Sequence, residues 1–106
     1  MKRVYICSPL AGDIEGNMNR ALEYCRFAAK QGCIPYAPHV YFPRFLDDTN
    51  REERHIGLHE GLKWLSDCAE LWVFGDKISA GMSAEIEYAD ANKIPIRWFE
   101  SDMKEI

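Results

Sequence analysis

The chain has 106 residues, of which 47% are hydrophobic, and this length supports one compact domain that we expect to span residues 1–106. The formal net charge is -4 and the longest basic run is the pair Lys2 and Arg3, so the composition argues against a nucleic-acid partner. The first apolar run is too short for a signal-peptide core, and none approaches the roughly 20 residues of a membrane span. We expect a soluble, cytoplasmic protein with no membrane partner.

Neither the cysteines nor the histidines form a metal-binding pattern. The four cysteines stand at wide spacings with no C-x-x-C pair, which favours free thiols, mostly buried, in a reducing compartment. They are Cys7, Cys25, Cys33 and Cys68. His55 and His59 are four residues apart on one predicted helical face, but the H-E-x-x-H order and a partnering cysteine pair are both missing. We expect no metal site and no cofactor.

Short apolar runs alternate with longer periodic segments along the chain. The runs predict strands at 4–7, 33–36, 69–74 and 94–99, and the periodic segments predict helices at about 17–31, 51–66 and 82–92. Such alternation predicts an α/β fold, specifically a small flavodoxin-like or Rossmann-like three-layer sandwich whose parallel sheet has the strand order 2-1-3-4. The proline- and aromatic-rich connection 38–50 is long enough for a lid or an interface, and we expect the polar tail 100–106 to be frayed.

With this strand order, the loops that follow Cys7 and Phe74 face each other across one crevice, where open α/β sheets bind ligands. Glu85 falls in the first turn of the helix after that second loop and is a candidate nucleophile or general base. Other polar side chains that can converge on the crevice are Tyr5, Ser8, Asp13 and Ser79. The N–H groups of Gly81 and Met82 could hold an anion at the helix N-terminus.

Each of these residues also has a purely structural interpretation. A glutamate in the first helical turn is favoured by the helix dipole by roughly 0.3–1 kcal/mol whether or not it reacts. Ser79 and Ser83 are candidate caps, and capping is the favoured interpretation for Ser83. Gly75 and Gly81 fit ordinary turns, and Tyr5 fits a core residue. The charges from Asp47 to Arg54 suggest a solvated helix start capped by Asn50.

Two segments carry a resemblance to a known family. Residues 59–74 (HEGLKWLSDCAELWVF) and 79–89 (SAGMSAEIEYA) resemble the nucleoside 2-deoxyribosyltransferase superfamily, and the similarity extends over nearly the whole chain. The chain is most similar to the small 2'-deoxynucleoside 5'-monophosphate N-hydrolases and to their short, uncharacterised bacterial and phage relatives. The resemblance implies a single domain of this type and a small-molecule nucleoside or nucleotide as the partner.

The resemblance also implies roles for particular residues. Glu85 matches the catalytic glutamate, and Tyr5 matches the tyrosine that orients it. Ser79 matches a serine that contacts the 5'-phosphate in the hydrolases. Gly12 matches a glycine of the first loop, and His39 stands where the hydrolases also carry a histidine. Ser8 and Gly81 complete the expected substrate-binding set. Because members of this superfamily share sites between subunits, a homodimer or larger homo-oligomer is also implied.

The chain departs from the family pattern at three positions. An aspartate of the hydrolases would fall at Gly61, and polar and basic residues of their phosphate loop become Pro9 and Ala11. The leading hypothesis is an N-glycosidase or deoxyribosyltransferase that cleaves the bond between base and sugar through Glu85. The departures support the alternative, a nucleotide-binding module of the same fold without turnover. A flavodoxin-like electron carrier is a weaker third hypothesis, because the first loop lacks a hydroxyl-rich stretch.

Overall fold

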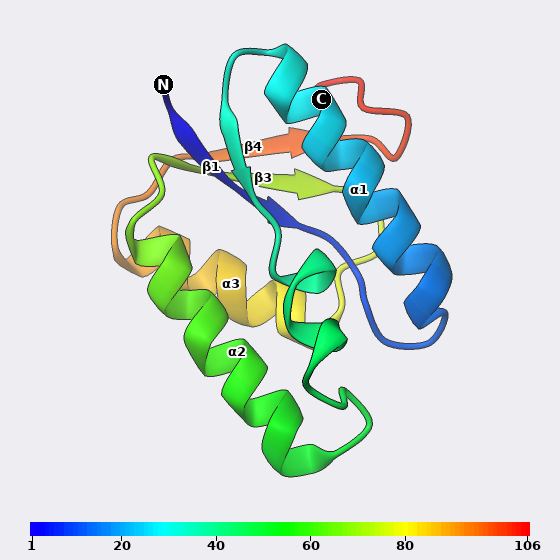
Figure 1. The fold of residues 1–106 in the computed structure, drawn as a ribbon. Coiled ribbons are helices and arrows are strands. Elements are labelled where there is room, and N and C mark those ends of the chain that lie inside the picture. The colour runs from blue at the N-terminus through cyan, green and yellow to red at the C-terminus, as the bar shows by residue number, and fades with distance from the viewer.

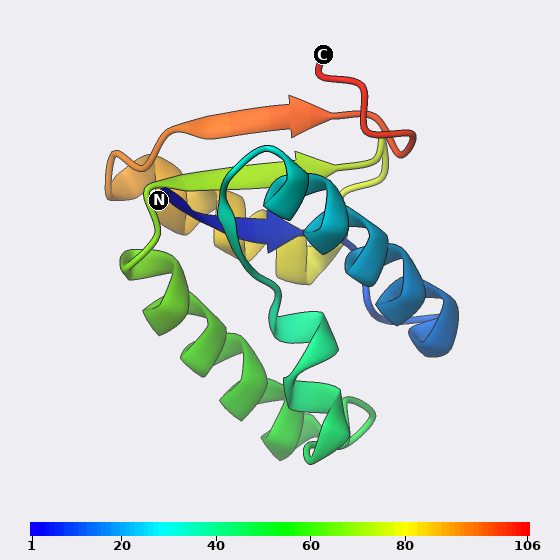
Figure 2. The ribbon, with the colours of Figure 1, turned by 45° about the horizontal axis from the view of Figure 1, so that its top comes forward.

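The computed structural model describes all residues from 1 to 106, and its centre is a four-stranded parallel sheet with the order β2-β1-β3-β4. The strands are β1 (Arg3–Cys7), β2 (Ile34–Tyr36), β3 (Glu70–Phe74) and β4 (Ile96–Phe99), and the helices are α1 (Ile14–Lys30), α2 (Arg51–Ser66) and α3 (Ala80–Ala91). Helix α1 covers one face of the sheet, whereas α2 and α3 lie together on the other (Figures 1 and 2). The predicted flavodoxin-like α/β fold and its strand order are confirmed.

Alternation along the two central strands divides the core into two layers. On β1, Val4 and Ile6 belong to the cluster that faces α1, while Tyr5 and Cys7 belong to the cluster on the side of α2 and α3. Successive strand residues point to opposite faces, and all four of these side chains are at most 1% exposed. Tyr5 is therefore held on the same side of the sheet as α3.

The register of the central strands brings their carboxyl ends together. β1 and β3 pair in parallel with Cys7 opposite Val73, so the loops that follow these two strands leave the sheet side by side. The loop after β1 turns toward α1, and the loop after β3 turns toward α3 (Figure 1). This divergence is the switch point at which open α/β sheets form a ligand crevice.

Capping side chains set where the helices begin. Asn50 accepts a hydrogen bond from the N–H of Glu53 at 3.0 Å, and α2 begins at Arg51 as predicted. Helix α1 begins at Ile14, three residues before the predicted start, because the Asp13 carboxylate accepts from the N–H of Gly16 at 3.1 Å.

Helix α3 also begins earlier than predicted, at Ala80. The hydroxyl of Ser79 accepts a hydrogen bond from the N–H of Met82 at 3.2 Å, which makes Ser79 the cap. The expectation that Ser83 caps this helix is wrong, since Ser83 lies inside the first turn. Glu85 is consequently in the second turn, two residues further into the helix than the predicted boundary implied.

The long connection between β2 and α2 is folded into two short 3₁₀ helices, η1 (Pro38–Val40) and η2 (Phe42–Arg44). Its aromatic side chains pack on α2, where the rings of Tyr41 and Phe42 lie 5.2 and 5.4 Å from the ring of Trp64, centroid to centroid. Tyr41 is nevertheless 46% exposed and Phe45 59% exposed.

No helix of the structure combines the length and the apolarity needed to cross a membrane.

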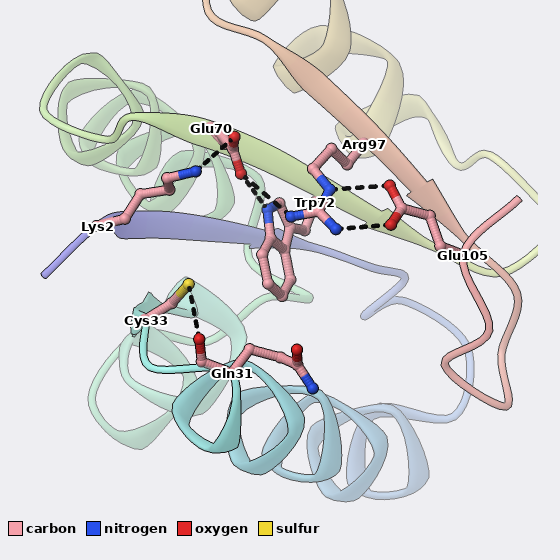
Figure 3. Close-up of polar contacts among 7 residues, drawn as sticks. All are labelled: Lys2, Gln31, Cys33, Glu70, Trp72, Arg97 and Glu105. Atoms are coloured by element: carbon pink, nitrogen blue, oxygen red, sulfur yellow. Dashed lines mark hydrogen bonds and ion pairs between the residues drawn. The ribbon is translucent and has the colours of Figure 1, made fainter.

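The C-terminal tail is ordered against the sheet, so the expectation that residues 100–106 are frayed is wrong. Glu105 forms an antiparallel bridge with Phe99, and its carboxylate accepts two hydrogen bonds from Arg97 at 2.8 and 2.6 Å (Figure 3). The Arg97 guanidinium also lies 4.8 Å from the ring centroid of Trp72. The tail is thus held by its backbone bridge to Phe99 and by Arg97, which links Glu105 to the buried ring of Trp72.

Arg97→Ala is expected to lower the free energy of unfolding by about 1 kcal/mol, because it removes the ion pairs of Arg97 with Glu105 and Glu70 and a cation–π contact. Urea denaturation measures this change. The matched control is Lys104→Ala, which removes a tail charge that forms no ion pair in the structure. Equal stability of the Arg97→Ala and Lys104→Ala variants would show that the tail contributes nothing through Arg97.

Candidate active site

A pocket of about 200 Å³ opens at the carboxyl end of β1. Its walls come from β1 and the loop after it, from the 3₁₀ segment, from the first half of α2 and from the first two turns of α3. The apolar part of the lining includes Leu10, Pro38, Phe42, Pro43, Leu46, Leu58 and Met82. The polar part consists of Tyr5, His39, Asp48, Glu53, Arg54, Ser79 and Glu85. An apolar pocket with a few convergent polar groups is typical of small-molecule sites.

Glu85 lines this pocket and is only 5% exposed. The hydroxyl of Tyr5 donates a hydrogen bond to Glu85 Oε2 at 2.5 Å. This bond joins β1 to α3 across 80 positions of sequence and fixes the rotamer of the carboxylate. The predicted pair of Tyr5 and Glu85 is thus brought together by the fold.

Burial controls the ionisation of this pair. Loss of hydration raises the pKa of Glu85 to about 7, although hydrogen bonds from Tyr5 and Cys7 act in the opposite direction. The pKa of Tyr5 is raised well above its usual range by burial and by the neighbouring carboxylate. Tyr5 therefore stays a neutral donor, while Glu85 exchanges its proton near neutral pH.

His39 is held by η1 against the first loop. Its Nε2 lies 2.6 Å from the carbonyl oxygen of Ser8, and a carbonyl can only accept, so Nε2 carries the proton. Burial lowers the pKa of His39 below its usual value. The ring is then a neutral imidazole whose Nδ1 has a free lone pair.

We expect His39 to stay in the neutral Nε2–H tautomer down to a lower pH than an exposed histidine. Long-range ¹H–¹⁵N correlation spectra recorded across a pH titration distinguish the two tautomers and the cation. A short, solvent-exposed histidine peptide in the same buffer serves as the reference. Titration of His39 at the same pH as this peptide would contradict the buried placement of His39.

The other predicted site residues are divided between the pocket and its surroundings. Ser79 and Gly81 line the pocket. Ser8 does not line it: its carbonyl pairs with His39, and its buried hydroxyl has no hydrogen-bond partner. Gly12 and Asp13 are also outside the lining; Gly12 adopts a left-handed turn conformation with φ +96° before α1, and Asp13 caps that helix. The N–H of Met82 is occupied by the hydroxyl of Ser79.

The wall formed by α2 was not predicted from the sequence. Asp48, Glu53 and Arg54 line the pocket, although their charge pattern suggests a solvated helix start. Arg54 forms no ion pair with any acidic side chain. The sequence feature that could have indicated this wall is the presence of Phe42, Leu46 and Leu58 on either side of these charges. These apolar residues form a wall only when the 3₁₀ segment folds onto α2.

No group of three or more histidine, cysteine, aspartate or glutamate side chains is arranged to hold a metal ion. All four cysteines are free; Cys7 and Cys68 are buried, and Cys25 and Cys33 are partly exposed. The ionisable groups that line the pocket are three carboxylates, one phenol, one imidazole and one guanidinium.

Comparison with known families identifies the family of this chain. A family model described as Domain of unknown function (DUF7768) matches residues 2–99. The chain belongs to this family. The matched region of DUF7768 includes every strand and helix described above and all residues that line the pocket. A search of curated proteins finds no match to the chain.

Among solved structures, a 2-deoxyribosyltransferase from the psychrotolerant bacterium Bacillus psychrosaccharolyticus is similar to this DUF7768 member. The TM-score is 0.68, and the alignment covers 92% of this chain and 72% of the enzyme at 16% sequence identity. At this sequence identity the similarity shows that the two proteins share a fold.

Proposed function

We propose that this protein cleaves the N-glycosidic bond of a nucleoside or nucleotide, with Glu85 as the nucleophile, and passes the sugar to water or to a second base. The observation that carries the proposal is the position of Glu85: it is a buried carboxylate that accepts a hydrogen bond from Tyr5 and lines a mostly apolar pocket. The deoxyribosyltransferase fold is consistent with this chemistry.

The proposed role of Glu85 depends on where charge develops while the glycosidic bond breaks. As the bond between C1' and the base nitrogen breaks, its electron pair leaves with the base and positive charge builds on C1' and the ring oxygen. The Glu85 carboxylate stabilises that charge and can form a bond to C1'. Attack on C1' by water or by a second base then releases Glu85 and gives free sugar or a new nucleoside.

The remaining lining residues suit the other parts of such a substrate. The ring of Phe42 and the side chains of Leu10 and Met82 offer apolar contact to a flat base. The Nδ1 of His39 can accept a hydrogen bond from an amino or hydroxyl group. Arg54 can pair with an anionic group at the edge of the pocket.

Incubation with a panel of ribo- and 2'-deoxynucleosides and their 5'-monophosphates, with and without an added acceptor base, tests the proposal. Chromatography follows the free base and any new nucleoside. Release by the unmodified protein, lost in Glu85→Gln and kept in Glu87→Gln, is the expected result; Glu87 is an exposed carboxylate two residues further along α3. Absence of release from every compound would overturn the proposal.

A second candidate function, nucleotide binding without turnover, is supported by Gly61, where the resemblance implies an aspartate. It predicts that a nucleotide raises the melting temperature of the protein while no base appears over prolonged incubation. A melting temperature that rises in parallel with base release would favour the enzyme instead.

A further inference from the structure

Gly61 lies where helix α2 makes its closest approach to Tyr5. The glycine is buried, and a Cβ atom built on it would be 2.8 Å from the Tyr5 hydroxyl oxygen, a distance that real Cβ atoms essentially never show. The next neighbours are two atoms of the Pro38 ring at 3.9 Å, which is ordinary contact. Any side chain at position 61 would therefore compete with the Tyr5 hydroxyl and with little else.

The Tyr5 hydroxyl has little freedom to move away. Its ring is fully buried on β1, a central strand of the sheet. Its oxygen lies between the backbone of α2 at Gly61 and Glu85 Oε2 on α3, to which it donates. A displacement of several tenths of an ångström, imposed from the side of α2, would strain or break the hydrogen bond to the carboxylate.

We propose that Gly61 is a positioning residue: by lacking a side chain it lets the Tyr5 hydroxyl lie against α2 and hold the Glu85 carboxylate. The part of this inference that concerns catalysis rests on the function proposed above, whereas the contact itself does not. In the present arrangement the Cβ atom of an aspartate at this position would meet the Tyr5 hydroxyl.

Four variants isolate the contact. Gly57 lies one turn earlier on the same helix, and a Cβ atom there would meet only Leu46 Cδ1 at 3.8 Å, so Gly57→Ala is a matched control for helix propensity. The remaining variants are Gly61→Ala, Tyr5→Phe and the double variant. Removing the hydroxyl removes the steric conflict, so the effect of alanine at position 61 depends on residue 5.

Thermal unfolding gives the first readout. We expect Gly57→Ala to raise the melting temperature by a few degrees, because alanine is favoured over glycine inside a helix. Gly61→Ala should lower it when Tyr5 is present and raise it in the Tyr5→Phe background. Failure of Gly61→Ala alone to fold, with a folded double variant, would equally support the conflict. Equal melting-temperature changes for Gly61→Ala in both backgrounds would overturn it.

The second readout is the titration of Glu85, followed by ¹³C NMR of its carboxyl group. Loss of the hydrogen bond from Tyr5 disfavours the carboxylate, so Gly61→Ala and Tyr5→Phe should each raise the Glu85 pKa by about one pH unit. The double variant should match Tyr5→Phe, and Gly57→Ala should match the unmodified protein. A Glu85 pKa unchanged by Gly61→Ala would overturn the positioning role even if stability falls.

Neither readout uses enzymatic turnover. If Glu85→Gln keeps full base release, the proposed function fails while the coupling between positions 61 and 5 stands. If base release is found and depends on Glu85, the acid limb of its pH profile should move upward in Gly61→Ala together with the Glu85 pKa.

Discussion

Glu85→Gln is expected to abolish base release and, in the same protein, to increase stability above neutral pH. Loss of the nucleophile should lower the rate by at least about 1,000-fold. The gain in stability has a separate cause. Folding raises the Glu85 pKa from an ordinary 4.5 to about 7, so the stability that Glu85 contributes is complete below about pH 4.5 and is lost as the pH rises to about 7. Glutamine is neutral throughout and avoids this loss.

The size of the effect follows from the shift in pKa, which corresponds to about 3 kcal/mol, or roughly 10 °C in melting temperature for a domain of this size. Thermal unfolding of both proteins near pH 4 and near pH 8 measures it. The two curves should nearly coincide at the lower pH and separate at the higher one. The exposed Glu87→Gln control should have the melting temperature of the unmodified protein at both pH values. If Glu85→Gln also matches the unmodified protein at both, ionisation of the buried carboxylate has no cost in stability.

The pH dependence of base release should report the same ionisation. The carboxylate is the reactive form, so kcat/KM should fall about tenfold per pH unit below pH 7 and level off above it, since kcat/KM reports ionisations of the free enzyme. A nucleoside is the better substrate for this measurement, because a 5'-phosphate has its own ionisation near pH 6. The rate is followed by chromatography of the free base between about pH 5 and 9.

An independent titration of Glu85 in the ligand-free protein by ¹³C NMR is the control, because its midpoint must coincide with the acid limb of kcat/KM. Burial lowers the pKa of His39 below its ordinary value, so any limb from His39 should lie on the acid side of the Glu85 limb. A flat profile between about pH 5 and 8 would mean that Glu85 is not the group whose ionisation governs catalysis.

The sequence was sufficient to predict the topology because hydrophobic burial dominates it. Alternating buried positions such as Leu71, Trp72, Val73 and Phe74 produce a two-sided core, and the alternation of strands with helices leaves few other arrangements. The start of a helix was predicted well only where one capping side chain was available, as at Asn50. For the start of α3 the sequence offers two candidate caps, Ser79 and Ser83, and in the structure Ser79 is the cap.

The site was only partly predictable for a related reason. Tyr5 and Glu85 follow from the switch point of the sheet, which depends on strand order. Arg54, Glu53 and Asp48 line the pocket because the 3₁₀ segment packs on α2, and that packing depends on aromatic contacts between distant residues. The close approach of Gly61 to Tyr5 depends on helix position at a resolution of tenths of an ångström, which no sequence pattern encodes.

The two borders of the sheet bear on how copies of this protein could associate. At one border β2 has only three residues and includes Pro35, which has no N–H to donate. At the other border Glu105 pairs with Phe99, and the N–H of Ile106 donates to the carbonyl of Trp98 at 2.9 Å. Neither border offers a free backbone ladder to a strand of another molecule. Copies would therefore associate through side-chain surfaces and not by adding strands, and the large exposed apolar side chains on helices and loops include Tyr41, Phe45 and Ile56.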